Sequence, residues 1–256
     1  MKLQNRLVIL RCVRYEGPIS RVDLQKKTRL SWGTISASTR ELLDSGILTE
    51  IGAVTTDMGR RPVELDLNQA DNFVLGLQLG SALVRSALMN MKGCVVAELD
   101  VPVNAAGTTA EILRCLIDTG NRLLRQHGVW RSSLMGIGVA VPGAVDFSTG
   151  ISLYAPQHPN WKNVALKDRF ERTFGVPCYV DHSFNCFALS EQLFGLCTAT
   201  FRGRFENLPQ FHSAGFRPRA ITSDSITVSV PSSTAPREPQ ERNWVEFALS
   251  ILSLVA

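Results

Sequence analysis

The amino-acid sequence predicts a winged helix-turn-helix domain followed by an α/β domain. Residues 1–70 hold three short helical patterns and then a hairpin-like stretch rich in glycine and arginine. Residues 71–196 alternate strand and helix signals, which is the order typical of an α/β fold. Residues 197–256 form an atypical tail, in which arginine, proline, serine and threonine dominate as far as residue 243. We expect this tail to be poorly ordered.

The composition leaves the class of partner open. The chain has 256 residues, 45% of them hydrophobic and 20% charged, so it is long enough for two domains with real cores. Its formal net charge of +4 permits a nucleic-acid partner without requiring one. The six cysteines form no CxxC pair, so we predict neither a metal site nor a disulfide framework. We also expect no cofactor. The sequence holds no run of about 20 apolar residues, and we expect a cytoplasmic protein without a membrane partner.

Apolar spacing and capping residues predict the first two helices. In NRLVILRCVRY, Leu10 and Val13 follow helical spacing, and a Gly-Pro pair at Gly17 ends this helix. The second helix, SRVDLQKKT, begins at Ser20 as its cap, with Asp23 at the capping-box position in place of glutamate or glutamine. A short link, RLS, leads from this helix to the next.

A third helix is predicted within SWGTISASTRELLDSG, from a cap at Ser31 to a stop at Gly46. Ile35 and Leu42 share its apolar face. The opposite face is light and polar, and it includes Gly33. Small side chains allow a helix to lie deep in the major groove, while hydroxyls and arginine reach phosphates or base edges. The residues predicted to contact DNA in this way are Ser31, Thr34, Ser36, Ala37 and Arg40.

A hairpin follows the third helix. The stretches ILTEIGAV and RPVELDLN read as strands that bracket TTDMGR. This is the pattern of a wing, whose tip residues Arg60 and Arg61 are predicted to enter the neighbouring minor groove. Two alternatives stay open at this stage. Trihelical units with a hairpin also serve as dimerisation modules, and the two arginines could be solvated surface charge.

The middle of the chain predicts the element order βββαβαβα. Three strands are expected in FVLGLQLGSALVRSALMNMKGCVVAELDVPV, and helices and buried strands alternate after them. The first hairpin has the outline of a phosphate-binding turn, because its glycines allow backbone N–H groups to approach a phosphate. Phosphoryl transfer also needs an acidic residue to hold Mg²⁺, whereas the residue before the Leu-Gly turn is Gln78, which carries no charge.

Two long stretches carry a family resemblance. GIGVAVPGAVDFSTGISLYAPQHPNW and FGVPCYVDHSFNCFALSEQLFG resemble the ROK family of repressors, open reading frames and sugar kinases. With LLDSGILTEIGAVTTDMGRRPVELDLN ahead of them, the chain resembles the repressor branch, the regulators of N-acetylglucosamine, glucose and xylose use. The resemblance runs from about residue 5 to residue 196. It implies an actin-like α/β lobe that binds a sugar or sugar phosphate, and a homodimer that binds a near-palindromic operator.

Departures from the family pattern argue against catalysis. Family kinases carry a DxGxT-type motif where this chain has QLGSA at 78–82, and a V-E-N-D-x-N stretch where it has VDHSFN at 180–185. Ser183 therefore stands at the place of the aspartate base, and a serine hydroxyl needs a base of its own to take a proton. We predict no catalytic residue and no enzyme activity. The resemblance implies sugar contacts at Gly143, Gln157, His182 and Ser183.

The resemblance stops near residue 196, and the second lobe of the family is missing. The family continues into a glycine-rich GTGIGAG-like segment and a GH…CxCGxxGC zinc site, and residues 197–256 match neither. A divergent lobe is one explanation. A frameshift or premature fusion in the coding sequence is the other, and we favour it because the composition changes abruptly.

The sequence as a whole predicts a sequence-specific DNA-binding regulator, and a repressor of sugar-utilisation genes in particular. Its expected partners are operator DNA, a sugar or sugar phosphate, and a second copy of the chain. Two alternatives remain: a ROK sugar kinase with an appended domain, and a non-functional remnant of a regulator. The operator and the sugar are not predicted.

Overall fold

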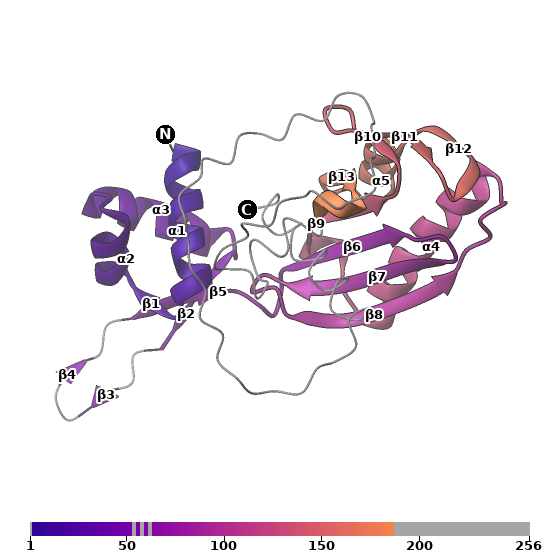
Figure 1. Cartoon of the computed structure of the whole chain (residues 1–256). Helices are drawn as coiled ribbons and strands as arrows, with labels where there is room; N and C mark the ends of the chain where they lie inside the picture. The colour runs from indigo at the N-terminus through magenta and orange to yellow at the C-terminus, as the bar shows by residue number, and fades with distance from the viewer. Residues whose placement is uncertain (1, 53–54, 57–58, 61–62, 187–256) are drawn as a thin grey trace, which may run out of the picture.

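The computed structural model describes residues 2–52, 55–56, 59–60 and 63–186, and it has the predicted fold class (Figure 1). We call residues 2–67 the head. The helices and strands of the head are α1 (Lys2–Glu16), β1 (Ile19–Ser20), α2 (Arg21–Thr28), α3 (Trp32–Asp44), β2 (Leu48–Ile51), β3 (Thr55–Thr56), β4 (Gly59–Arg60) and β5 (Glu64–Leu67). The predicted tail, residues 197–256, lies outside the described residues.

The α/β part begins after a linker, residues 68–72. Its elements are β6 (Phe73–Leu79), β7 (Leu83–Asn90), β8 (Val95–Pro102), α4 (Thr109–Gln126), the 3-10 helix η1 (Arg131–Ser133), β9 (Leu134–Val141), β10 (Ala144–Asp146), β11 (Ile151–Ala155), β12 (His158–Ala165), α5 (Leu166–Phe174) and β13 (Cys178–His182). Residues 183–186 are helical, as predicted. No helix in the described part of the chain is long and apolar enough to cross a membrane.

Serine side chains begin α2 and α3, as predicted. Ser20 Oγ accepts a hydrogen bond from Asp23 N at 3.2 Å, and its hydroxyl donates to Asp23 Oδ2 at 2.7 Å. Ser31 Oγ accepts from Thr34 N, also at 3.2 Å. Each cap satisfies a backbone N–H that the helix itself leaves unpaired. The end of α3 is confirmed too, because Gly46 follows it with a φ of +72°, which glycine adopts without strain.

The predicted wing is present beyond α3. β2 pairs antiparallel with β5, with Leu48 opposite Leu67, and β1 borders β5 on its other side. Further out, β3 pairs antiparallel with β4, with Thr55 opposite Arg60 (Figure 1). The strands therefore continue the head into a hairpin that extends away from the helices.

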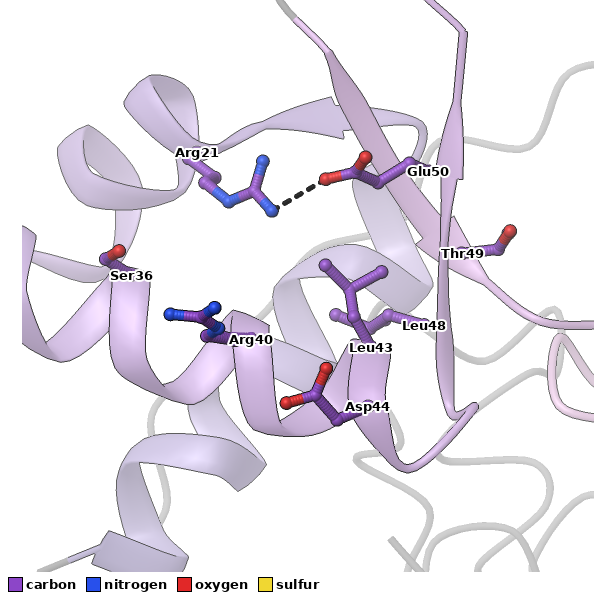
Figure 2. A pocket seen from close by; sticks show the side chains of 8 residues that line it. All are labelled: Arg21, Ser36, Arg40, Leu43, Asp44, Leu48, Thr49 and Glu50. Carbon is purple, nitrogen blue, oxygen red and sulfur yellow. Dashed lines mark hydrogen bonds and ion pairs between the residues drawn. The ribbon is translucent and has the colours of Figure 1, made fainter.

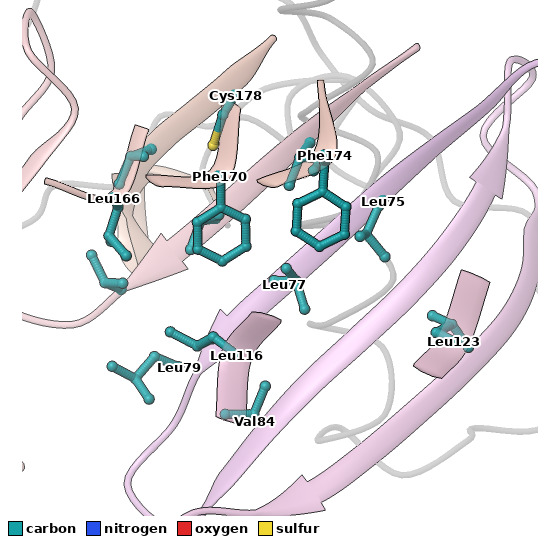
Figure 3. Close-up of a cluster of buried hydrophobic side chains, with 14 of the residues drawn as sticks. Leu75, Leu77, Leu79, Val84, Leu116, Leu123, Leu166, Phe170, Phe174 and Cys178 are labelled. Carbon is teal, nitrogen blue, oxygen red and sulfur yellow. The ribbon is translucent and has the colours of Figure 1, made fainter. Parts of the chain in front are cut away.

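A five-stranded sheet of order β13-β9-β6-β7-β8 forms the centre of the α/β part. β6, β9 and β13 are parallel, and β7 and β8 are antiparallel to their neighbours. α4 and α5 pack on one face of this sheet, where Leu75, Leu116 and Phe174 belong to one buried cluster (Figure 3). The packing is tight at Gly120 of α4, since a Cβ there would lie 3.0 Å from Leu75 Cδ2. A larger side chain would have to displace this core.

A second sheet, of order β10-β11-β12, lies between β9 and α5 in the chain and was not predicted. β12 buries every third residue, His158, Trp161 and Val164, rather than every second. Asn163 also has a φ of +50° within this strand. Neither feature matches the alternation by which a half-buried strand is recognised. β12 runs to Ala165, and α5 begins at the next residue, Leu166.

The parallel strands run from the head to the far edge of the sheet. β6 begins directly after the linker, and the β7–β8 turn lies at the same edge, where Lys92 Nζ is 2.6 Å from Asp66 Oδ2 of β5. The other ends of β6, β9 and β13, at Leu79, Val141 and His182, share the opposite edge. We call this second edge the cleft edge.

A cluster of buried apolar side chains continues from the head into the sheet. It includes Ile9 and Leu48 of the head together with Val74, Ala87 and Met89 of the sheet. A second cluster fills the space between the sheet and the helices α4 and α5. Packing is thus continuous next to residue 70, and the division of the chain at this residue stays a prediction.

Candidate nucleic-acid interface

The outer side of α3 exposes most of the residues predicted to contact DNA. Ser36, Ala37 and Arg40 are exposed, whereas Ile35 and Leu42 are buried. Helical spacing causes this separation, because residues three or four positions apart share a face. Between the exposed Trp32 at the start of the helix and Arg40, the stripe carries only the small side chains of Gly33, Ser36 and Ala37, so a second molecule can approach the helix closely there.

Thr34 differs from the prediction. Its side chain is half-buried, and its hydroxyl lies 2.9 Å from the Ser31 hydroxyl. Ser31 itself is exposed, and it caps the helix as well. The two hydroxyls therefore satisfy each other in the absence of a ligand, and only Ser31 faces solvent fully.

A pocket of about 750 Å³ lies between α3 and the beginning of the wing (Figure 2). Arginine, acidic, hydroxyl and leucine side chains line it, namely Arg21, Ser36, Arg40, Leu43, Asp44, Leu48, Thr49 and Glu50. Two of the predicted DNA contacts, Ser36 and Arg40, belong to this wall. The hollow lies beside the stripe on α3, and its wall carries two carboxylates, Asp44 and Glu50, as well as the two arginines, of which Arg21 is paired with Glu50.

Arg21 is a residue of this interface that the sequence analysis missed. Its Nη2 donates to Glu50 Oε1 at 2.8 Å, and its Nε donates to Thr39 Oγ1 at 3.3 Å. One side chain of α2 thereby joins α3 to β2, and it fixes the angle between α3 and the wing. Arg40, by contrast, has no hydrogen-bond or ion-pair partner among the described residues, so its guanidinium is available to a ligand. No local sequence signal predicts a contact such as Arg21–Glu50, which spans 29 positions.

Ion pairs on the inner side of α3 hold the helix in place. Glu41 pairs with Lys2 at 2.6 Å and with Arg6, both on α1. Hydrogen bonds from Lys2, which has the larger effect, and from Arg6 lower the pKa of Glu41.

Trp32 is a second residue of this surface that was not predicted. It starts α3 and is 49% exposed. The wing tip cannot be placed in the same way: Arg61 lies outside the described residues, and only the backbone of Arg60 is described.

The four predicted sugar contacts all lie at the cleft edge. Gly143 follows β9 with a φ of +88°, and a Cβ there would lie 2.1 Å from the Tyr154 carbonyl oxygen, so this turn requires glycine. Gln157 is exposed, and its neighbour His158 is buried with Nε2 2.8 Å from the Gly80 carbonyl oxygen. His182 and Ser183 are half-buried at the end of β13, which pairs directly with β9. β13 lies two strands from β6, so the ends of these two strands are about 10 Å apart.

A hydrogen bond to His182 determines which ring nitrogen carries the proton when the ring is neutral. Its Nδ1 accepts from Phe184 N at 3.2 Å, so the neutral ring carries its proton on Nε2. Burial lowers the pKa of His182, and the charge of Asp181 acts in the opposite direction. Asp181 is half-buried and accepts from Asn185 Nδ2 at 2.9 Å, and burial raises its pKa. Its carboxylate is therefore partly withdrawn from solvent and is bound to a side chain of the helical turn that follows β13.

Trp161, which lies on β12 shortly after Gln157, packs inside the α/β part. Its side chain is fully buried, and its Nε1 donates to Ser152 Oγ at 2.8 Å. Asp146 caps a turn, because it accepts from the hydroxyls of Ser148 at 2.7 Å and Thr149 at 2.8 Å. Neither residue is oriented to contact a ligand at the cleft edge.

Two family models match the chain. The first is a winged helix-turn-helix DNA-binding model over residues 3–49, and the second is the ROK family model over residues 74–200. The chain therefore carries a ROK family domain behind a winged helix-turn-helix DNA-binding domain. Both parts of the resemblance noted in the sequence are confirmed.

Regulators of sugar use are among the proteins similar to this chain. The xylose repressor of Caldicellulosiruptor bescii is 31% identical over 195 residues, which cover 76% of this chain and 49% of that protein. The DNA-binding transcriptional dual regulator NagC of Escherichia coli K12 is 28% identical over 195 residues, covering 76% and 48%. A crystal structure of a ROK family transcriptional regulator, a homolog of the E. coli MLC protein, aligns with a TM-score of 0.65 and 28% identity over 75% of this chain and 48% of that chain. The chain spans about half the length of the curated relatives it matches.

Proposed function

We propose that the chain is a sequence-specific DNA-binding regulator that represses sugar-utilisation genes. The observation that carries this proposal is the exposed stripe of Ser36, Ala37 and Arg40 on α3, beside the pocket at the root of the wing. Such a light surface fits the major groove. The names of the relatives, a xylose repressor and the regulator NagC, support the same conclusion.

The two DNA-contacting parts have different tasks in this proposal. Ser31, Thr34, Ser36, Ala37 and Arg40 contact base edges and phosphates of the major groove. When the head binds DNA, the Thr34 hydroxyl gives up its hydrogen bond with Ser31 and forms one with the DNA. Arg60 and Arg61 at the tip of the wing enter the minor groove, where arginine reads the width and potential of the groove.

Fluorescence anisotropy with the full chain tests the proposal. A duplex is first selected from a randomised pool by the wild-type chain, and its affinity is compared with that of a scrambled duplex over a range of salt concentrations. We expect tighter binding to the selected duplex, and an affinity that falls steeply as salt rises, because phosphate contacts release counterions. Equal affinity for both duplexes at every salt concentration would show that the binding is not specific.

Matched arginine variants identify the surface that binds. Arg40→Ala is expected to lower the affinity for the selected duplex by about 1–3 kcal/mol if Arg40 contacts a base. Arg122→Ala is the control, because Arg122 is exposed on α4, outside the head. A double variant, Arg60→Ala with Arg61→Ala, tests the wing in the same assay. Unchanged affinity in that double variant would contradict the assignment of the minor-groove contacts.

We propose further that a sugar or sugar phosphate binds at the cleft edge and releases the DNA, and that two copies of the chain bind one operator. Gly143, Gln157, His182 and Ser183 are the proposed contacts. His182 offers an N–H donor on Nε2, and Gln157 offers an exposed amide. Titration with D-xylose, D-glucose and N-acetylglucosamine, with and without a 6-phosphate where one exists, tests whether any of them weakens DNA binding. Analytical ultracentrifugation of the DNA complex tests the proposed dimer.

We propose that the chain does not phosphorylate the sugar. Ser183 has no hydrogen-bonded base among the described residues, and β6 carries Gln78 where a magnesium-binding acid is needed. Turnover of ATP with glucose, N-acetylglucosamine, mannose or xylose above a control without protein would refute this. Two other expectations stay predictions: the cytoplasmic location, and a shifted reading frame after codon 196, which the nucleotides downstream of that codon decide.

A further inference from the structure

We propose that Lys92, in the turn between β7 and β8, is a positioning residue for DNA binding, because it fixes the orientation of the head on the sheet through Asp66. We call residues 91–94 the clamp turn. Lys92 Nζ lies 2.6 Å from Asp66 Oδ2, and this ion pair joins the α/β part to the last strand of the head. The DNA readout in its test rests on the proposed function, whereas the motion of the head is measured independently.

The clamp turn is pre-formed by its own hydrogen bonds. Asn90 Oδ1 accepts from Lys92 N at 3.1 Å and from Cys94 N at 2.9 Å. Asn90 Nδ2 donates to Gln69 Oε1 of the linker at 3.3 Å. Gly93 has a φ of +85°, which closes the turn without strain. The lysine is therefore presented towards the head by a rigid turn rather than by a mobile loop.

Asp66 is a carboxylate with little contact to solvent. Its side chain is 6% exposed, and Lys92 is its ion-pair partner among the described residues. Its other oxygen, Oδ1, accepts from Leu67 N at 2.8 Å. Gly17, at the end of α1, leaves room for this carboxylate, since a Cβ there would lie 2.8 Å from Asp66 Oδ1. A buried carboxylate without its partner is costly, so the head is held where Lys92 can reach it.

Apolar packing supports the ion pair. Met89 lies just before the clamp turn and Met91 is its first residue, and both are buried in the cluster that also contains Ile9 and Leu65 of the head. The apolar contact excludes water and supplies attraction, but methionine packs adaptably and fixes no angle. The directional contact on this side of the head is the one between Lys92 and Asp66.

The recognition helix is tied to the same edge of the sheet from a second side. The carbonyl oxygen of Gly46, just after α3, accepts from Asn68 Nδ2 at 3.1 Å and from Asn72 Nδ2 at 2.8 Å. Both asparagines belong to the linker that leads into β6. α3 therefore has one attachment through the linker and one through β5 and the clamp turn. If the attachment through β5 and the clamp turn is lost, the head can turn about the attachment through the linker.

The test uses the full chain and measures the motion of the head and DNA affinity in parallel. Backbone ¹⁵N relaxation gives a rotational correlation time for the amides of the head and another for those of the five-stranded sheet. We expect equal times in the wild-type chain and in Lys92→Arg, which keeps the charge. In Lys92→Met we expect a shorter time for the head and an affinity for the selected duplex lower by about tenfold, a usual size for a residue that acts on a site it does not touch. Lys162→Met, on the exposed side of β12, is the control and should behave as wild type.

Two outcomes would overturn the proposal. The first is a difference between the correlation times of the head and the sheet in the wild-type chain. The second is a Lys92→Met variant in which these two times stay equal and DNA affinity is unchanged. If Lys92→Met does not fold, the double variant Asp66→Asn with Lys92→Met replaces it, because it leaves no buried charge unpaired. Its head is expected to tumble faster than the sheet, and recovery of wild-type times and affinity would refute the positioning role. If Lys92→Met frees the head while even the wild-type chain prefers no duplex, the clamp stands and the proposed function fails.

Discussion

Replacing Ser31 by alanine tests the start of the recognition helix, and the structure provides a matched control. Ser31 and Ser20 both accept from a backbone N–H three residues later at 3.2 Å. Loss of such a cap costs about 1 kcal/mol, and about twice that at most. Each variant also loses one side-chain hydrogen bond, and Ser20→Ala is expected to cost at least as much as Ser31→Ala because the bond from Ser20, at 2.7 Å, ends on the carboxylate of Asp23. Each variant should therefore unfold about 2–8 °C below wild type in a thermal scan.

The two variants should differ in DNA binding. Ser31 is exposed on the outer side of the head, whereas Ser20 is 5% exposed. At 25 °C both variants remain folded, so lower stability alone leaves affinity unchanged. Ser31→Ala should lose about fivefold in affinity for the selected duplex, the value of one hydrogen bond of about 1 kcal/mol, and Ser20→Ala should lose none. An equal loss in both variants, or none in either, would refute the assignment of Ser31 to the interface.

Three further predictions concern the α/β part. Gly143→Ala should lower the free energy of unfolding, measured in urea, by more than about 2 kcal/mol, because a Cβ there would lie 2.1 Å from the Tyr154 carbonyl oxygen. Gly128→Ala is the control: its φ is +63° but the space around it is open, so it should lose only about 1 kcal/mol. Phe174→Ala should lose about 3–5 kcal/mol in the same titration, because the ring is buried between α4, α5 and the sheet; a loss below about 1 kcal/mol would contradict this packing. Burial lowers the pKa of His182, so the folded chain binds this proton less readily than the unfolded chain, and stability should fall as pH drops below about 6.5. His182→Gln should flatten that part of the stability profile, and an unchanged slope would count against the shift.

Local signals explain the features that were predicted correctly. The caps at Ser20 and Ser31 depend on side chains that bond to an N–H three residues away, and a sequence shows such spacing directly. The stop at Gly46 is equally local. The spacing of apolar residues predicts the helices of the head and the first strands of the sheet, because that spacing reflects which face of each element is buried.

Features that depend on distant partners were not predictable in this way. The sheet β10-β11-β12 was missed because its burial follows a period of three, with a left-handed residue at Asn163. The contacts of Arg21 with Glu50, and of Lys92 with Asp66, join positions 29 and 26 apart. Nothing in the neighbourhood of either residue distinguishes it from an ordinary surface cation. Thr34 was assigned to the outer face by its helical position, but its side chain is half-buried and its hydroxyl lies 2.9 Å from the Ser31 hydroxyl.

The two asparagine contacts at the end of α3 have a practical meaning for anyone who transplants this head onto another protein. A fusion joined at residue 70 keeps Asn68 but discards Asn72, and it also discards the whole clamp turn. Asp66 would then be a carboxylate in an apolar setting with no cation to meet it. A graft that carries residues 2–94 retains both attachments, together with the β6–β7 hairpin on which the head rests. The transferable unit of this regulator is therefore longer than its helix-turn-helix, and it includes the first hairpin of the domain that follows.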